Sequence, residues 1–153
     1  MALLSFLAKK PLLTDPDTAL IVDAIRSSEK KTSGEVRVYV ESRCRFVDSL
    51  DRASEIFYSL KMDQTEFRNA VLVYVAVKDH QLAVFADEGI YQKAGADFWN
   101  AAVKKMLLHF NAQNYGTGIA GIVTEIGNTL QLNFPYNEQT DKNELPDDIV
   151  FGK

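Results

Sequence analysis

Cysteine and histidine are scarce in this chain of 153 residues, which contains one cysteine, Cys44, and two histidines, His80 and His109. A disulfide within the chain is therefore impossible, and a cysteine-rich zinc site is excluded. The two histidines are far apart in the sequence and do not form a metal-binding pair. Any metal site must therefore use oxygen ligands, which select hard ions such as Ca²⁺ and Mg²⁺.

Long apolar runs and an excess of basic residues are also missing. The apolar start of the chain is shorter than the roughly 18–20 residues of a membrane helix, and no basic residue precedes it as in a signal peptide. Lysine and arginine number 17 against 21 aspartate and glutamate residues. A nucleic-acid partner is not expected, because phosphate contacts supply most of the affinity for nucleic acids. We expect a soluble cytoplasmic protein without a membrane segment.

The composition is typical of one folded domain. Hydrophobic residues make up 46% of the chain and charged residues 25%, and the length fits a single domain. We therefore predict one domain over residues 1–153. Its last part, residues 133–153, is polar and acidic, and we expect it to form a C-terminal arm. The charged residues and prolines of this arm are Pro135, Glu138, Asp141, Lys142, Glu144, Pro146, Asp147, Asp148 and Lys153.

Alternation and helical periodicity predict three strands and four helices. Residues 34–41 alternate as a strand with one buried face, residues 69–77 form an apolar run typical of a central strand, and residues 82–86 return antiparallel to it. Helices are expected after Thr14, after Asp48, over the apolar stripe from Phe98 to Phe110, and over the stripe from Ile119 to Leu130. Residues 148–151 are a candidate for a fourth short strand.

The order of these elements predicts an α/β fold. The first two strands should be parallel and joined by a right-handed helical crossover. An αβα sandwich around a small mixed sheet follows, because each face of the sheet must be covered by helices. The G-x-G-x-x-G pattern from Gly116 to Gly121 is not preceded by a strand, so it predicts helix packing rather than a dinucleotide site.

One end of the predicted sheet gathers carboxylates. We call it the near end: the starts of the first two strands and the end of the third. Its acidic residues are Glu29, Glu35, Asp63, Glu66, Asp87, Glu88 and Asp97, partly balanced by Lys30, Lys31, Arg68 and Lys93. Converging carboxylates are stabilised by protonation, by salt bridges or by a bound cation.

The near end therefore predicts a site for Ca²⁺ or Mg²⁺. The loop before the second strand adds neutral oxygens, including the hydroxyl of Thr65, and the number of carboxylates is enough for a pair of ions. The alternative is a solvated acidic surface with ion pairs to the nearby basic residues.

Several of these residues belong to motifs that resemble the TPM-domain family, which is named for a thylakoid lumen protein, a photosystem II repair factor and an acetylcholine-receptor modulator. The motifs are Glu29-x-x-Thr32-Ser-Gly-Glu-Val-Arg-Val38, Thr65-x-x-Arg68-Asn-Ala-Val-Leu-Val-Tyr-Val-Ala76, Ala86-Asp87-x-Gly89-Ile90, Phe98-Trp99 and Asn143-Glu-Leu-Pro-Asp147. They extend over nearly the whole chain, which looks like a stand-alone member without the exported or membrane-anchored context of many relatives.

The resemblance implies an αβα sandwich around a four-stranded sheet, with divalent-metal binding at one sheet end. For some members it implies an acid phosphatase activity. Glu35 and Asp87 match the family's acidic positions best, and Glu29, Asp63 and Glu88 match less well. Beside them, we expect a structural hydrogen bond from Asn69 and charge balance from Arg68.

Three functions follow as hypotheses. The first is a metal-responsive domain, in which Ca²⁺ or Mg²⁺ orders the loops of the near end and regulates contact with a protein partner. The second is a metal-assisted phosphatase, although the sequence shows no activated nucleophile and no group of arginines to hold phosphate. The third is a metal-independent interaction module whose acidic arm is the contact surface.

Overall fold

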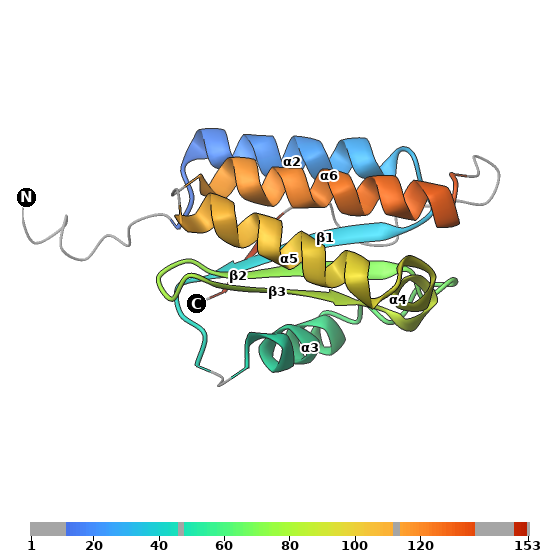
Figure 1. Ribbon diagram of the computed structural model, residues 1–153, viewed down its shortest axis with the longest axis horizontal. Coiled ribbons are helices and arrows are strands. Elements are labelled where there is room, and N and C mark those ends of the chain that lie inside the picture. Colours follow the sequence, from blue (N-terminus) through green and yellow to red (C-terminus); the bar gives the residue numbers. More distant parts are fainter. Residues whose placement is uncertain (1–11, 46–47, 112–113, 137–148, 153) are drawn as a thin grey trace, which may run out of the picture.

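The computed structural model describes residues 12–45, 48–111, 114–136 and 149–152. Helices and strands form three layers, with α2, α5 and α6 on one face of the sheet and α3 on the other (Figure 1). The elements in chain order are α2 (Asp15–Glu29), β1 (Glu35–Glu41), α3 (Ser49–Ser59), β2 (Ala70–Ala76), β3 (Gln81–Ala86), α4 (Glu88–Ala94), α5 (Ala96–Asn111), α6 (Tyr115–Asn133) and β4 (Val150–Phe151). The predicted αβα arrangement is confirmed.

The sheet has four strands in the order β3-β2-β1-β4. β1 runs parallel to both β2 and β4, and β2 runs antiparallel to β3, so the sheet is mixed as predicted. The short fourth strand comes from residues near the C-terminus. It leaves β3 and β4 as the two edge strands.

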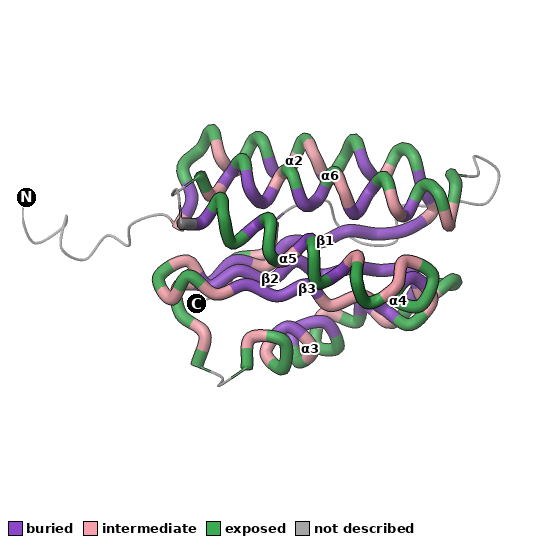
Figure 2. The backbone as a smooth tube through the Cα atoms, in the orientation of Figure 1, coloured by how far each residue is buried: buried purple, intermediate pink, exposed green. Residues whose placement is uncertain are grey.

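The alternation of side chains sorts the core into two parts, one on each face of the sheet. Val36, Val38 and Val40 of β1 pack toward α2, α5 and α6, whereas Leu72 and Tyr74 of β2 pack toward α3. All seven residues of β2 are buried, because both of its faces are covered. Figure 2 shows the same pattern in the helices, whose inner sides are buried and whose outer sides are exposed.

Helix starts follow the predicted capping. The Thr14 hydroxyl accepts a hydrogen bond from Asp17 N at 3.2 Å, and the Asp48 carboxylate accepts one from Leu50 N at 2.9 Å. The sequence did not separate α4 from α5. This seven-residue helix is too short for a periodic stripe, and it is capped by Asp87, whose carboxylate accepts from Glu88 N.

The described parts of the C-terminal arm contact the rest of the fold. Ser33 N donates to Phe134 O at 3.0 Å, Tyr136 N donates to Lys31 O at 3.2 Å, and Thr32 forms an antiparallel bridge with Pro135. All the acidic residues of the arm, which fall within residues 137–148, and Lys153 lie outside the described residues. In the part of the chain that is described, no helix is long and apolar enough to cross a membrane.

Candidate metal site

The near end forms where the sequence places it, beside α4 in Figure 1. Glu35 N donates to Asn69 O at 3.3 Å, Asp87 N donates to Ala70 O at 2.9 Å, and Gly89 N donates to Arg68 O at 2.8 Å. These backbone bonds join the starts of β1 and β2 to the end of β3. The segment of residues 65–69 lies between the other two pieces of chain.

Glu35 and Asp87 occupy equivalent places on either side of β2. Glu35 is opposite Ala70 in the β1–β2 ladder, and the β2–β3 register continues from Val71–Ala86 to Ala70–Asp87. Alternation places both side chains on the face that α3 covers, with Ala70 between them. Their Cα atoms are about 10 Å apart, which is twice the usual spacing of neighbouring strands. Both are buried, with exposed fractions of 2%.

Asp87 is already paired in the structure. Arg68 Nε donates to Asp87 Oδ2 at 2.7 Å and Arg68 Nη2 donates to Oδ1 at 2.9 Å, a bidentate ion pair. Glu88 Oε1 lies 3.3 Å from Arg68 Nη1 but is largely exposed. The hydrogen bond to Asp87 raises the pKa of Arg68 against the opposing effect of desolvation, and the charges of Asp87, Glu88 and Asp63 add to it. Arg68 thus supplies the charge balance expected of it.

The backbone at this pair is constrained. Arg68 has φ of 51°, in the left-handed region that few residues other than glycine and asparagine adopt readily. A Cβ atom at Gly89 would lie 2.2 Å from Phe67 O and 2.6 Å from Arg68 O. Glycine is therefore required where the start of α4 approaches this segment. This explains the Asp-x-Gly spacing that the sequence shows.

Glu29 and two buried neutral oxygens complete the inner part of the near end. The Glu29 carboxylate accepts from Val36 N at 3.4 Å, at the start of β1. Asn69 is fully buried, and its Nδ2 donates to Ser33 Oγ at 3.4 Å, as expected. Among the described residues, Asn69 Oδ1 and Thr65 Oγ1 are buried without a hydrogen-bond partner. Such atoms require an explanation, and a bound cation or water supplies one.

The remaining predicted ligands are less buried. Asp63 is half-buried and close enough to Arg68 to affect its pKa, whereas Glu66 and Asp97 are exposed. Within the described ranges, the structure contains no group of three or more carboxylate, histidine or cysteine side chains already placed to hold an ion. The donor set is nevertheless composed of oxygen alone, as Ca²⁺ and Mg²⁺ require.

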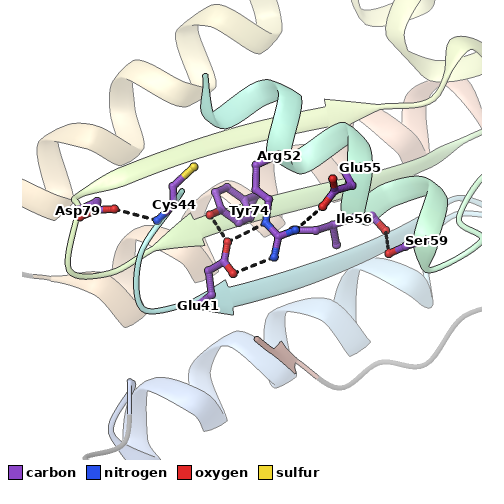
Figure 3. Close-up of polar contacts among 8 residues, drawn as sticks. All are labelled: Glu41, Cys44, Arg52, Glu55, Ile56, Ser59, Tyr74 and Asp79. Atoms are coloured by element: carbon purple, nitrogen blue, oxygen red, sulfur yellow. Dashed lines mark hydrogen bonds and ion pairs between the residues drawn. The ribbon is translucent and has the colours of Figure 1, made fainter. Parts of the chain in front are cut away.

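At the opposite end of the sheet, the structure shows a buried ion pair that the sequence did not predict (Figure 3). Arg52 of α3 donates from Nε and Nη2 to the two carboxylate oxygens of Glu41, each at 3.0 Å, and the Tyr74 hydroxyl donates to Glu41 Oε2. Burial alone would raise the pKa of Glu41, but the bonds from Arg52 and Tyr74 outweigh it and lower that pKa. Burial and Glu41 raise the pKa of Tyr74.

This ion pair holds α3 against the sheet, because Arg52 belongs to α3 and Glu41 and Tyr74 belong to the strands. The only signal in the sequence is that Glu41 falls on the face of β1 that α3 covers. The neighbouring loop is fixed separately, because Asp79 accepts from Cys44 N at 2.8 Å and from Arg43 Nη1 at 2.9 Å.

Residues 8–129 match the family model of the TPM domain. The chain belongs to the TPM-domain family. The matched range includes every predicted ligand, from Glu29 to Glu88, together with Arg68 and Gly89. The carboxylates that flank β2 in this TPM domain therefore lie within the part that the family shares.

Two solved structures show the same fold. The BA42 protein from the psychrophilic bacterium Bizionia argentinensis is 38% identical with a TM-score of 0.85, and the alignment covers 95% of this chain and 99% of that one. The N-terminal domain of the cg2496 protein from Corynebacterium glutamicum is 13% identical with a TM-score of 0.57, covering 81% of this chain and 86% of that one. This second likeness concerns the fold alone. A search of curated proteins gives no match.

Proposed function

We propose that this TPM domain binds a divalent cation, Ca²⁺ or Mg²⁺, at the near end of its sheet. The observation that carries the proposal is the placement of Glu35 and Asp87, two buried carboxylates on the same face of the sheet with only Ala70 between them in the row. Buried carboxylates are costly unless they are paired, hydrogen-bonded or coordinated to a metal ion.

The oxygen atoms at the near end suit a bound Ca²⁺ or Mg²⁺ ion. Glu35 and Asp87 would supply the inner carboxylates, and the Asn69 amide and Thr65 hydroxyl have buried oxygens that lack hydrogen-bond partners among the described residues. Glu29, Asp63, Glu66 and Glu88 lie on the adjoining segments and would supply further oxygens or a second site. A bound ion would order the loops there, because its ligands come from separate pieces of chain. In this proposal the domain acts in the cytoplasm and regulates a protein contact.

Arg68 determines how this site responds to a cation. It occupies both oxygens of Asp87, so an ion that uses Asp87 competes with the guanidinium. An exchange between a salt bridge and a metal ligand would couple cation binding to the positions of residues 65–69 and of α4. Regulation of a partner would then follow from this local change.

The test is a calorimetric titration of the chelator-treated protein with Ca²⁺ and with Mg²⁺. We expect a dissociation constant in the range of sensor sites, about 10⁻⁷–10⁻⁵ M for the preferred ion. Glu35→Gln and Asp87→Asn should each weaken it at least about tenfold, the loss typical of an altered metal site. Asp51→Asn, an exposed acid on α3, is the matched control and should leave the affinity unchanged.

Two results would overturn the proposal. One is the absence of heat of binding for both ions at millimolar concentration. The other is binding that Glu35→Gln and Asp87→Asn leave as strong as Asp51→Asn does. Thermal melts of each variant without the ion separate a loss of the site from a loss of folding.

A further inference from the structure

One edge of the sheet is open between two helices. β3 is an edge strand, and α3 and α5 lie on either side of it (Figure 1). A groove of about 610 Å³ follows residues 82–86. Ser49 and Leu50 of α3 form one wall, and Tyr91, Trp99 and Val103 form the other. The walls are mostly apolar, and Leu50 and Tyr91 are exposed by 47% and 43%.

The register shows which backbone groups of β3 face this groove. Asp87 N donates to Ala70 O, so residues 87 and 70 form a hydrogen-bonded pair. Pairs alternate in an antiparallel ladder, so Phe85 and Ala83 also bond to β2, whereas the backbone groups of Leu82, Val84 and Ala86 face outward. The Ser49 hydroxyl confirms this direction, because it donates to Leu82 O at 3.2 Å from the groove side.

Within the described residues, the outward N–H and C=O groups of Val84 and Ala86 have no hydrogen-bond partner. Unpaired edge groups are a template for another strand. Their spacing by two residues matches the period of an extended peptide, and apolar walls on both sides suit side chains that alternate.

We propose that this groove binds an extended segment of another polypeptide, which adds a fifth strand to the sheet beside β3. The segment carries apolar side chains at alternate positions and one carboxylate. The carboxylate follows from charge complementarity, because Lys104 is the only charged side chain among the described residues that line the groove, and it is exposed. Main-chain bonds supply the affinity, and the two walls supply the side-chain preference.

A second copy of this chain is a poorer occupant than a peptide. β3 lies recessed between α3 and α5, and the same helices would flank β3 in the second copy (Figure 1). Two recessed edges cannot approach to the spacing of about 4.8 Å that paired strands need. A single strand without flanking helices can enter. This inference goes beyond cation binding and does not depend on it, since the groove uses none of the predicted ligands.

The test uses a defined probe, an acetylated and amidated peptide of alternating valine and threonine with one central glutamate. Binding is followed by backbone amide shifts of the isotope-labelled full chain. A series of probes, each N-methylated at one residue, reports the hydrogen bonds of the peptide. We expect affinity to fall about tenfold at every second position and to stay within about twofold at the positions between. The amides of Val84 and Ala86 should gain protection from hydrogen exchange.

Variants of the chain provide a second reading. Val84→Pro removes an outward N–H without breaking a bond to β2, and it should abolish binding. Lys104→Glu should lower the affinity for the probe that carries glutamate and raise the affinity for a probe that carries lysine at the same position. Lys105→Glu is the matched control, because Lys105 pairs with Glu125 outside the groove and should affect neither probe. If Val84→Pro does not fold, the N-methylated probes and the Lys104→Glu variant still test the proposal.

Four outcomes would overturn the proposal. The first is that the probe does not bind at concentrations up to about 1 mM, since a weaker affinity would not be specific. The second is binding that does not depend on the position of the N-methyl group. The third is amide shifts that map away from β3. The last is a concentration-dependent dimer that Val84→Pro dissolves, which would assign the edge to a second copy.

Discussion

Arg68 donates hydrogen bonds to both carboxylate oxygens of Asp87, at 2.7 and 2.9 Å, and its own backbone has a positive φ. The pair links the segment that leads into β2 to the residue directly after β3, across the end of the sheet. One side chain of the pair is buried and the other is partly exposed, with exposed fractions of 3% for Asp87 and 38% for Arg68. The guanidinium can therefore leave toward solvent, while the carboxylate cannot.

Arg68→Asn is expected to strengthen cation binding. Asparagine tolerates positive φ, so the substitution removes the guanidinium without adding backbone strain. Without the ion, the buried Asp87 loses its charged partner, and the free energy of unfolding should fall. With the competitor gone, the dissociation constant for the preferred ion should fall about tenfold, since each ~1.4 kcal/mol is a factor of ten.

Calorimetry and thermal melts with and without the ion measure both effects. Arg26→Asn, an exposed arginine in the last turn of α2, is the control for a lost positive charge. An affinity that is unchanged or weaker in Arg68→Asn would show that Arg68 positions Asp87 for the ion and does not compete with it.

Two glycine-to-alanine substitutions should have opposite effects on stability. At Gly89 a Cβ atom would lie 2.2 Å from Phe67 O, and this backbone contact cannot move aside easily. Gly89→Ala should therefore cost about 1–3 kcal/mol, the range for overpacking. At Gly121 in α6 nothing lies within 4 Å of the added Cβ. Gly121→Ala should stabilise the protein by about 0.5–1 kcal/mol through the better helix propensity of alanine.

Chemical denaturation of the two variants gives the comparison directly. The measurement also tests the near end as a packed structure, because only the first substitution touches residues 67–69. Equal effects of the two substitutions would contradict the close approach of α4 to this segment.

The sequence predicted most of the framework because its signals are strong there. The alternation of Val36, Val38 and Val40 matches β1, and the apolar run before Lys78 matches the doubly covered β2. The fourth strand was only a candidate, because two residues carry too little pattern. The short helix α4 was missed for the same reason.

The partners at the two ends of the sheet could not be predicted from spacing. Four basic residues near one end were possible partners of the carboxylates, and the fork of Arg68 reaches Asp87 because its own backbone turns at positive φ. Glu41 is alternate to Val40 in β1 and looked like a solvent-facing residue. It is buried because α3 covers that face and brings Arg52 to it.

The pH dependence of stability should depend on Glu41. Its pKa is lowered in the folded protein, so its contribution to stability is complete above the unfolded pKa, near 4.5, and is lost as pH falls through the lower folded value. Glu41→Gln should cost about 2 kcal/mol at neutral pH, the range for hydrogen bonds to charged groups. It should also flatten the stability profile below about pH 4.5.

Tyr74→Phe separates the two donors to Glu41. It keeps the pair with Arg52 but removes one bond to the carboxylate, so the acid transition should move to higher pH and stability at neutral pH should fall by about 1 kcal/mol. Denaturant titrations from pH 3 to pH 7 measure these changes. A profile for Glu41→Gln that is parallel to that of the unchanged protein would contradict the lowered pKa.

The attachment of the C-terminal arm is expected to depend on Thr32. Its hydroxyl donates to Phe134 O and accepts from Gly34 N at 3.0 Å, so it fixes both the turn before β1 and the first residues of the arm.

Thr32→Val keeps the shape and β-branching of the side chain but leaves these buried groups without a partner. The free energy of unfolding should fall by about 1–3 kcal/mol, which corresponds to a drop in Tm of about 2–4 °C per kcal/mol for a chain of this size. Thr124→Val is the control, because the Thr124 hydroxyl is exposed and donates to Ala120 O within its own helix. Thermal melts of the two variants should differ. Equal melting temperatures would mean that the arm stabilises the domain little, and its acidic residues would then be available as a separate contact surface.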